Sequence, residues 1–336
     1  MNVAVLLANM GGPDSLEAVE PFLIQIFSDP HIIDVPLPSF FRRRLARFIA
    51  RKRKEESIEI YRKLGGKTPL HEIMRRQAQA LQTVLNRQAE KNTTFHVHPA
   101  NRYGRPSLES VLTDIRNEDY DYLLVLSMYP FFATSTSGSI ASELRRLQKK
   151  LKIAPNRLHY VDRYGHRPDF IRAMAAHIRE QLAEVLQGEE PIDLLLSAHS
   201  IPQRHLDKGD PYFDEVRTAV AELQKELPQQ ITLHLAFQSK IGPVKWLEPS
   251  TDEKIKELAG AGVRRLFVYP LGFVADNSET VYEIGMLYKE LALQNGIKEF
   301  VRLEALNEQA EFVATLAEVV LEEVKTKDKR KKKKEK

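Results

Sequence analysis

The chain has 336 residues, of which 43% are hydrophobic and 29% are charged, and this length and composition are typical of a soluble globular protein with about two domains. It contains no cysteine, which excludes disulfides, thiolate catalysis and any zinc or iron–sulfur site held by cysteine. No apolar run reaches the ~18 residues of a membrane-spanning helix, and the first ten residues lack the features of a secretory signal peptide. We therefore expect a cytoplasmic protein.

The basic charge of the chain is concentrated at its C-terminal end. The formal net charge is +4, but residues 325–336 contain nine basic and two acidic side chains, so this segment carries +7 and the rest of the chain −3. Such a charge run predicts a disordered tail that either increases solubility or is attracted to anionic lipid or nucleic acid. Because the remaining chain is slightly acidic, we expect no nucleic-acid-binding domain.

In chain order, short apolar runs alternate with longer amphipathic segments. Runs that predict buried strands, each followed by turn residues, lie at 3–8, 122–127, 193–197 and 265–269. Segments that predict helices lie at 16–27, 68–88, 139–151, 168–186, 211–226, 251–261 and 278–295. This alternation predicts an α/β fold of doubly wound parallel sheets with helices on both faces.

The two halves of the sequence form a weak internal repeat. VAVLLANMGGP in the first half is similar to IDLLLSAHSIP in the second, and YLLVLSMYPFF is similar to RRLFVYPLGFV. The repeat predicts two similar domains that face each other, which we place at residues 1–160 and 161–324. Ligands of such sheets bind beyond the carboxyl ends of the strands, so we expect the four loops to meet at a central cleft.

The segment 37–54 combines aromatic and basic side chains. Phe41, Leu45 and Phe48 recur at helical spacing among eight basic residues. This pattern is typical of a basic amphipathic helix that rests on an anionic membrane surface. An ordinary packed helix with a solvated basic side explains the pattern equally well.

Three loops near predicted elements contain glycine or hydroxyl residues. NMGGP (9–13) and KLGGKTP (63–69) match no nucleotide-binding motif, and their glycines favour a tight turn or close contact with a flat ligand. Thr68 in the second loop is placed to cap the following helix. The hydroxyl-rich segment 134–139 fits either anion binding or a helix cap.

A histidine and two glutamates are the strongest candidates for chemistry. His199 follows a buried strand, where α/β enzymes place functional groups, although a lone histidine is more often structural. Glu279 and Glu283 lie four residues apart on a predicted helix, where like charges cost a few tenths of a kcal/mol. The pair therefore indicates cation binding or proton transfer. Favourable acidity in the first turn of a helix is the alternative, and it explains Glu279 better than Glu283.

The only tryptophan of the chain, Trp246, lies in a loop rich in proline and glycine at 236–253. A tryptophan in such a loop serves either as a lid over an apolar ligand or as an anchor into the core.

Taken together, eight segments resemble the ferrochelatase family, whose members insert ferrous iron into a porphyrin to form haem. They occur in the family's order from residue 6 to about residue 310. The segments are LLANMGGPDSLEAVEPFL, YRKLGGKTPL, RYGRPS, YPFFATSTSGS, LLLSAHSIP, GDPY, FQSKIGPVKWLEPSTDE and GFVADNSETVYE.

The resemblance implies two chelatase-like domains that enclose a porphyrin and release two protons as iron enters. It assigns His199 and Glu279 to the metal-insertion centre, as catalytic groups and as metal ligands. Imidazole and carboxylate suit a ferrous ion that must be released again, and an imidazole is suited to accept pyrrole protons. Which of the two accepts the proton is left open. Glu283 extends the acidic face as a candidate path for metal or protons.

The resemblance also implies a porphyrin-binding surface. The segment 37–54 matches the family's apolar lip, which faces a membrane, so the expected partners are porphyrin, ferrous iron and an anionic membrane surface. Residues that match positions near the propionates are Arg53, Tyr61 and Thr68. Residues that match the lining of the cleft are Met10, Arg102, Tyr103, Trp246 and Phe273.

The sequence departs from the family pattern in three respects. Asn277 stands where many relatives have a histidine, so a second imidazole is absent at that position. Leu287 stands where some relatives have a third acid, which shortens the expected acidic chain. The absence of cysteine excludes the iron–sulfur cluster found in part of the family, and insertion requires no organic cofactor.

Two rival functions fit parts of the sequence. A sirohydrochlorin chelatase would need a strongly basic cleft for a substrate with many carboxylates, whereas the candidate residues here are mainly aromatic and aliphatic. A haem or porphyrin carrier needs a firm axial ligand but no acidic face such as Glu279 with Glu283. Protoporphyrin and coproporphyrin both remain open as substrates.

Overall fold

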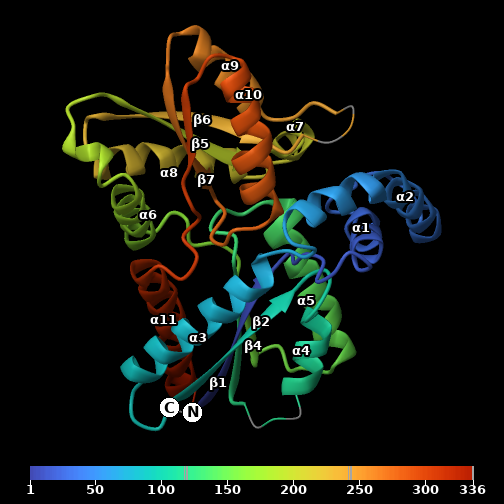
Figure 1. The fold of residues 1–336 in the computed structure, drawn as a ribbon. Helices are drawn as coiled ribbons and strands as arrows, with labels where there is room; N and C mark the ends of the chain where they lie inside the picture. The colour runs from blue at the N-terminus through green and yellow to red at the C-terminus, as the bar shows by residue number, and fades with distance from the viewer. Residues whose placement is uncertain (117, 119, 241, 243, 335–336) are drawn as a thin grey trace.

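The computed structural model describes residues 1–116, 118, 120–240, 242 and 244–334. The chain forms two lobes, each built on a four-stranded parallel sheet (Figure 1). The strand order is β2-β1-β3-β4 in the first sheet and β6-β5-β7-β8 in the second, so the α/β fold class predicted from sequence is confirmed. The strands are β1 Asn2–Asn9, β2 Thr94–Asn101, β3 Tyr122–Ser127, β4 Leu158–Val161, β5 Ile192–His199, β6 Ile231–Gln238, β7 Arg265–Leu271 and β8 Glu299–Arg302.

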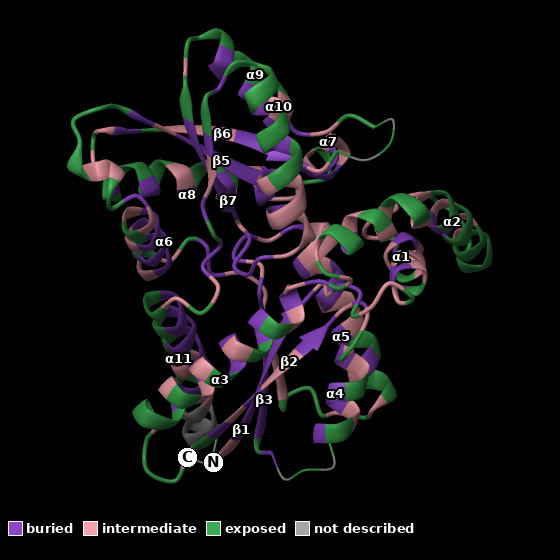
Figure 2. Cartoon of the chain, viewed as in Figure 1, coloured by how far each residue is buried: buried purple, intermediate pink, exposed green. Residues whose placement is uncertain are grey.

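The internal repeat corresponds to equivalent places in the two sheets. β1 and β5 each lie between an edge strand and the next central strand, and β3 and β7 are those central strands. The central strands are almost entirely buried, as Figure 2 shows in purple. They bury both faces because helices cover both sides of each sheet, and this explains their continuous apolar sequences.

Helices of ordinary α type connect the strands, and a π-helix follows β3 in one lobe and β7 in the other. The π-helices are η1 Thr134–Gly138 and η3 Glu279–Tyr288, and a short 3₁₀ turn, η2, spans Val185–Gln187. The α-helices are α1 Val19–Ser28, α2 Ser39–Lys63, α3 Leu70–Gln88, α4 Leu108–Ile115, α5 Ser139–Lys150, α6 Pro168–Gln181, α7 Gln203–Asp207, α8 Tyr212–Glu226, α9 Thr251–Gly260, α10 Lys289–Gln294 and α11 Ala310–Lys334.

One apolar core joins the two lobes. It includes side chains from one face of β1 and one face of β5, together with α3, α6, α8 and α11. Smaller cores lie on the other sheet faces, one beneath α4 and α5 and one beneath α9 and α10. Because the shared core holds both sheets, the loops after their strands are kept at a fixed relation to each other.

The C-terminal helix returns to the first lobe. α11 packs against both α3 and α6, and its last turns lie near the N-terminus (Figure 1). Residues 310–324, which we assigned by sequence to the second domain, therefore contact the first lobe, and residue 160 falls inside β4. The sequence analysis predicted no helix in this segment, and position along the chain alone does not tell which lobe a C-terminal segment contacts.

The basic C-terminal segment differs from the predicted disordered tail, because α11 continues to Lys334. Lysine and arginine are good helix formers, so a helix anchored by its apolar turns extends readily into them. Lys327 lies with its ammonium 3.5 Å from the ring centre of Tyr122. The predicted attraction of this segment to lipid concerns mainly side chains beyond Lys327, which lie outside those described. Within the described residues, every helix is too short or too polar to span a bilayer.

Candidate functional site

His199 is the last residue of β5, and hydrogen bonds with Ser200 and Tyr212 hold it in place. Its Nδ1 lies 2.6 Å from the carbonyl oxygen of Ser200, and the Tyr212 hydroxyl donates to the His199 carbonyl at 2.9 Å. Since a carbonyl only accepts, Nδ1 carries a proton, and Nε2 is the nitrogen left for chemistry. The ring centre of Phe273 lies 6.4 Å from that of the imidazole.

Glu279 begins η3 and faces His199. Its Oε1 lies 3.6 Å from His199 Nε2, and the two side chains are 38% and 39% exposed. The Asn277 side chain accepts a hydrogen bond from the Glu279 N–H at 2.8 Å, as a helix-capping residue does. The residue that replaces the family's histidine therefore fixes the start of η3, and the structure brings together the pair predicted from sequence.

The loop before Glu279 is anchored by Asp276. One oxygen of Asp276 accepts from Arg302 at 2.8 Å and from the Thr280 hydroxyl at 2.6 Å. Asn307 accepts from the Asp276 N–H at 2.9 Å and donates to its other carboxylate oxygen at 3.1 Å. These contacts fix the loop on both sides of its turn, so Glu279 is presented by a rigid segment.

Glu283 lies one turn further along η3 and points toward the end of β6. Its Oε1 accepts from the Ser239 N–H at 2.9 Å and the Tyr288 hydroxyl at 2.8 Å, and its Oε2 accepts from the Ser239 hydroxyl at 2.6 Å. Tyr288 lies five residues after Glu283, which is the spacing of hydrogen-bonded residues in a π-helix. Burial and the neighbouring Glu279 raise the pKa of Glu283 above its usual range.

The His199 imidazole titrates above its ordinary range. Desolvation by the surrounding protein lowers the pKa of His199, but the carboxylate of Glu279, the Ser200 carbonyl and Glu283 outweigh it and raise the pKa to about 9. The free pair is therefore an imidazolium beside a carboxylate at neutral pH. A cation that approaches Glu279 competes with that proton.

Three tyrosines surround the pair. Burial and the charge of Glu279 raise the pKa values of Tyr61, Tyr129 and Tyr212, in the case of Tyr61 to about 12. All three hydroxyls therefore keep their protons and act as neutral donors. Sequence analysis missed Tyr129 and Tyr212. The internal repeat gave a signal for Tyr129, because Tyr129 follows β3 directly and the equivalent residue of the second half, Tyr269, lies near the end of β7.

The loops after the first-lobe strands approach the same pair. Tyr129 donates to the Asn9 side chain at 2.9 Å, and Asn9 also accepts from the Met10 N–H at 2.7 Å. On α2, the Tyr61 hydroxyl lies 3.3 Å from the Ser278 hydroxyl beside Glu279. Tyr61 therefore contacts the residue directly before Glu279, and Met10 contacts Tyr129 through its backbone N–H at 3.3 Å.

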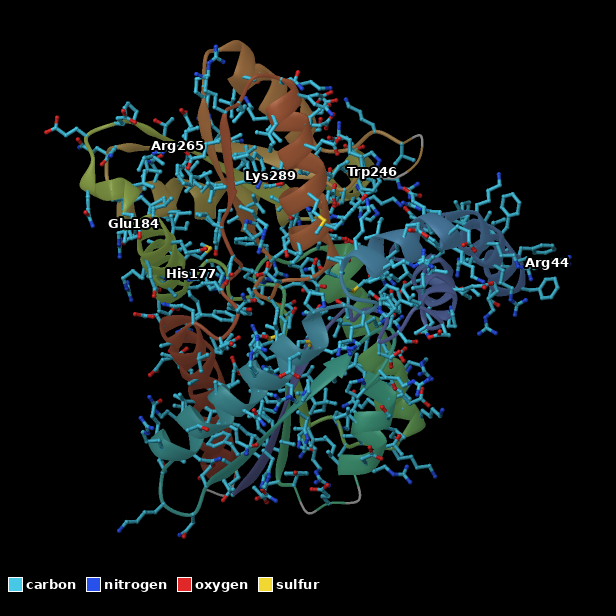
Figure 3. All side chains as sticks on the ribbon, in the orientation of Figure 1. Arg44, His177, Glu184, Trp246, Arg265 and Lys289 are labelled. Atoms are coloured by element: carbon cyan, nitrogen blue, oxygen red, sulfur yellow. The ribbon has the colours of Figure 1, made fainter. Side chains whose placement is uncertain are left out.

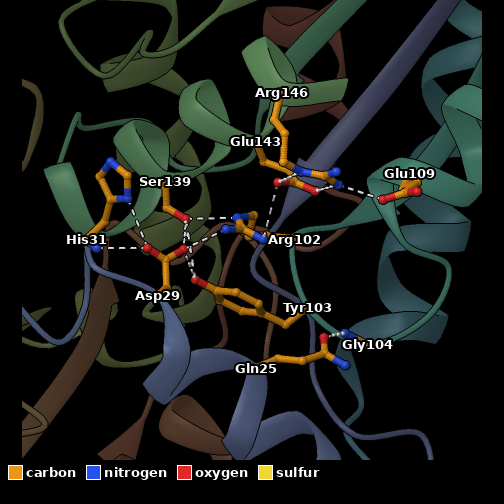
Figure 4. A network of polar contacts seen from close by, with 10 residues as sticks. All are labelled: Gln25, Asp29, His31, Arg102, Tyr103, Gly104, Glu109, Ser139, Glu143 and Arg146. Atoms are coloured by element: carbon orange, nitrogen blue, oxygen red, sulfur yellow. Dashed lines mark hydrogen bonds and ion pairs between the residues drawn. The ribbon is translucent and has the colours of Figure 1, made fainter. Parts of the chain in front are cut away.

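Arg102 and Tyr103 lie in a network around Asp29, at the end of α1 (Figure 4). Asp29 accepts from Arg102 and from the Tyr103 hydroxyl at 2.7 Å, from the Ser139 hydroxyl at 2.6 Å, and from the His31 N–H at 2.8 Å. Burial alone would raise the pKa of Asp29, but these donors hold it well below its usual range. Tyr103 is only 2% exposed. Sequence analysis missed this network.

The remaining expected residues occupy separate places. Arg53 lies on α2 with its Nε 3.9 Å from Glu56. Thr68 is buried and caps α3, with its hydroxyl accepting from Leu70 N at 3.3 Å. A side chain on Gly12 would meet Thr68 at 2.7 Å, so the two glycine-containing loops touch there. 

Trp246 lies in the loop beside α7 (Figure 3) and pairs through its backbone with Pro202. Its indole Nε1 is buried and has no hydrogen-bond partner among the residues that the structure describes. This contact places the tryptophan loop against the segment that directly follows His199.

Across the described part of the chain, no cluster of three or more histidine, aspartate or glutamate side chains is arranged to hold a metal. His199 and Glu279 therefore stand as a two-residue set, and Glu283 is held separately by Ser239. An imidazole and a carboxylate offer one nitrogen and up to two oxygens to a divalent ion.

Comparison with known proteins gives consistent matches along the chain. A family model described as ferrochelatase matches residues 2–324. The ferrochelatase of Geotalea uraniireducens is 42% identical over 317 residues, which cover 94% of this chain and 96% of that protein. The ferrochelatase of Aquifex aeolicus is 37% identical over 324 residues, which cover 96% of this chain and 100% of that protein.

Solved structures with low sequence identity share the architecture. SirB from Bacillus subtilis with Fe³⁺ aligns with a TM-score of 0.55 at 12% identity, covering 96% of this chain and 95% of that one. CbiX, described as the terminal enzyme of sirohaem biosynthesis in denitrifying bacteria, aligns with a TM-score of 0.53 at 15% identity, covering 95% and 98%. These similarities establish the chelatase fold and nothing about substrate.

Proposed function

Because the chain belongs to the ferrochelatase family, whose members insert ferrous iron into a porphyrin to form haem, we propose that His199 and Glu279 form the centre where insertion occurs. The enzyme is a metal chelatase of the lyase class. The observation that carries this proposal is the 3.6 Å approach of His199 Nε2 to Glu279 Oε1. The two residues arrive from the ends of neighbouring strands, and first-lobe loops face them.

Insertion requires removal of two pyrrole protons and entry of one divalent ion, so an acceptor and a cation ligand must lie close together. His199 Nε2 is the acceptor in this proposal, because Nδ1 is occupied by the Ser200 carbonyl. Glu279 receives the ferrous ion, and its rigid loop keeps its carboxylate near the imidazole. Arrival of the positive charge beside Glu279 favours loss of the resting proton from His199, which frees Nε2.

Glu283 serves as the next proton or metal station in this proposal. Its raised pKa makes it a readier proton acceptor than an ordinary carboxylate. Ser239 and Tyr288 hold it through three hydrogen bonds, so it is oriented before any substrate arrives. The reaction needs no organic cofactor, and a chain without cysteine holds no cysteine-ligated iron–sulfur cluster.

The porphyrin is proposed to lie between the lobes with its apolar face near Phe273, Met10 and Trp246. Burial of a flat apolar ring contributes ~25 cal/mol per Å², which supplies the binding energy needed to hold the ring in a non-planar form. Residues proposed to lie near its carboxylate arms are Arg53, Tyr61 and Thr68, and Arg102 and Tyr103 are proposed to belong to the lining of the cleft.

Insertion of ferrous iron into each porphyrin, measured anaerobically by absorbance, tests the substrate. We propose protoporphyrin IX or coproporphyrin as the acceptor, and the ratio of kcat/KM decides between them. Insertion of cobalt or iron into sirohydrochlorin, with no product from either porphyrin, would instead support the rival chelatase. Tight porphyrin binding without any metallation would support a carrier.

The helix α2 is proposed to touch a membrane. Phe40, Phe41 and Phe48 are 62%, 56% and 57% exposed, and cationic groups of Arg44 and Lys52 lie over two of these rings. α2 packs Ala46 and Ala50 against α1, and its exposed aromatic side chains lie outside that contact. Exposed aromatics among basic groups suit an anionic bilayer surface, so we propose a cytoplasmic enzyme in peripheral contact with the inner membrane face.

Replacing Phe40, Phe41 and Phe48 together with serine is expected to lower binding to anionic vesicles at least about tenfold, since each ring contributes ~1.5–3 kcal/mol when buried. Co-sedimentation with phosphatidylglycerol vesicles and with phosphatidylcholine vesicles measures the effect. Leu293→Ser on α10, which also removes an exposed apolar side chain (47%), is the matched control. Equal vesicle binding by the triple variant and wild type would contradict the membrane role.

A further inference from the structure

The first-lobe loop that leads into η1 is held by carboxylates of the second lobe. The Phe132 N–H donates to Glu215 Oε2 at 2.8 Å, and the Thr134 N–H donates to Asp210 Oδ2 at 2.6 Å. Both acceptors lie at the start of α8, and Arg163 stacks its guanidinium 4.4 Å from the Phe132 ring centre. Hydrogen bonds to charged acceptors are the stronger kind, so the start of η1 is tied firmly to α8.

The residues at this end of α8 also contact the backbone of His199. Asp210 uses its second oxygen, Oδ1, to accept from the Tyr212 N–H at 3.0 Å. The Tyr212 hydroxyl in turn donates to the backbone carbonyl of His199 at 2.9 Å. One carboxylate therefore links the backbone of Thr134 in the first lobe to the residue that holds His199 in the second.

A contact in the opposite direction completes the arrangement. Gln77 on α3 is fully buried, and its amide donates to the carbonyls of Val274 and Asn307, both at 2.8 Å. Val274 lies in the loop that leads from β7 to Glu279. α3 precedes β2 and α8 precedes β6, which are equivalent edge strands. Thus α3 in the first lobe and its equivalent α8 in the second each hold a loop of the other lobe, and each of these loops leads into a π-helix.

We propose that Asp210 is a positioning residue for iron insertion: it bonds the backbones of Thr134 and Tyr212 and thereby sets the distance between the first-lobe loop and His199. This inference rests on the proposed role of His199 and assigns a function to the GDPY segment, which the mechanism does not otherwise use. A flat ring held between two lobes reacts efficiently only when both surfaces lie at the right separation. A misplacement of 1 Å costs up to about 10²-fold in rate.

The test compares Asp210→Ala with wild type in anaerobic steady-state insertion assays on the full chain. We expect kcat to fall about tenfold, with the dissociation constant of the porphyrin, measured by fluorescence quenching, changed less than about threefold. Asp210→Asn keeps one accepting oxygen, so its kcat is expected to lie between those of wild type and Asp210→Ala. Asp193→Ala is the matched control, because it removes a carboxylate at the opposite end of β5 that contacts only His234 among the described contacts.

A double-mutant cycle with Tyr212 tells whether Asp210 positions His199 or only stabilises the fold. If Asp210 acts through Tyr212, the effects of Asp210→Ala and Tyr212→Phe on kcat are less than additive in the double variant. Unchanged kcat in Asp210→Ala, with only a lower melting temperature, would overturn the proposal, and so would unchanged kcat in Asp210→Asn should the alanine variant not fold. A wild-type chain that inserts no iron would contradict the proposed function instead, and that result is distinct from either.

Discussion

Replacement of His199 by alanine is expected to reduce iron insertion about 10²- to 10⁴-fold, the usual contribution of a positioned proton acceptor. Binding of the porphyrin is expected to change little, because His199 faces Glu279 and the apolar surfaces remain. Anaerobic single-turnover insertion followed by absorbance measures the first quantity. Quenching of porphyrin fluorescence measures the second.

A matched control exists on the neighbouring strand. His234 Nε2 pairs with Asp193 at 2.8 Å, so it is also an imidazole beside a carboxylate, but it lies toward the opposite end of the same sheet. His234→Ala is expected to insert iron at the wild-type rate. Full activity in His199→Ala would remove His199 from the centre, whereas equal losses in both variants would indicate a general effect on folding.

The convergence of His199 and Glu279 could be predicted from sequence because of strand order. Both follow buried apolar strands, and the ends of parallel strands gather ligands at one edge of a sheet. The structure shows that β5 and β7 are direct neighbours, which brings together residues eighty positions apart. The four central strands were recognisable for the same reason: burial on both faces leaves a continuous apolar run.

The edge strands were not recognisable. β2 has the sequence TFHVHPAN, which is only partly apolar, and His96 and His98 lie on its partly exposed face. β6 includes Thr232 and His234 in the same way. An edge strand has one neighbour and a more polar composition, so its pattern is close to that of a loop. α4 and α11 also escaped the sequence analysis.

The π-helical form of 279–288 illustrates a second limit. The segment 278–295 predicted a helix, and the structure confirms one over 279–294. The hydrophobic pattern of so short a segment indicates a helix but does not tell whether its hydrogen bonds run from i to i+4 or from i to i+5. The contact between Glu283 and Tyr288, which depends on the wider turn, was therefore invisible in the sequence.

Long-range polar networks were the hardest features to predict. Asp29 contacts Arg102, Tyr103 and Ser139 from 73 to 110 positions away. No spacing rule relates residues so far apart, and an Asp before a proline is a common turn signal. Arg102 and Tyr103 were identified by resemblance to a family, but their shared partner was not.

Asp29→Asn is expected to lower the free energy of unfolding by about 3 kcal/mol at pH 7, because removing one partner leaves the buried donors around it without their charged acceptor. The Asp29 side chain is 1% exposed and that of Arg102 is 18% exposed. Equilibrium unfolding in urea measures the change. Glu72→Gln on α3 is the matched control: it disrupts an exposed two-bond pair with Arg75 and is expected to leave the free energy of unfolding nearly unchanged.

The same variant also predicts how the contribution of Asp29 to the free energy of unfolding changes with pH. The pKa of Asp29 is lowered in the folded state, so the unfolded chain takes up the proton first, near the ordinary value of about 4. The stabilisation is therefore complete above about pH 5 and declines as the pH falls toward the folded pKa. Wild type is expected to lose more stability than Asp29→Asn between pH 5 and 3, so their difference narrows there. A difference independent of pH would mean that Asp29 contributes through shape and hydrogen bonding and not through its charge.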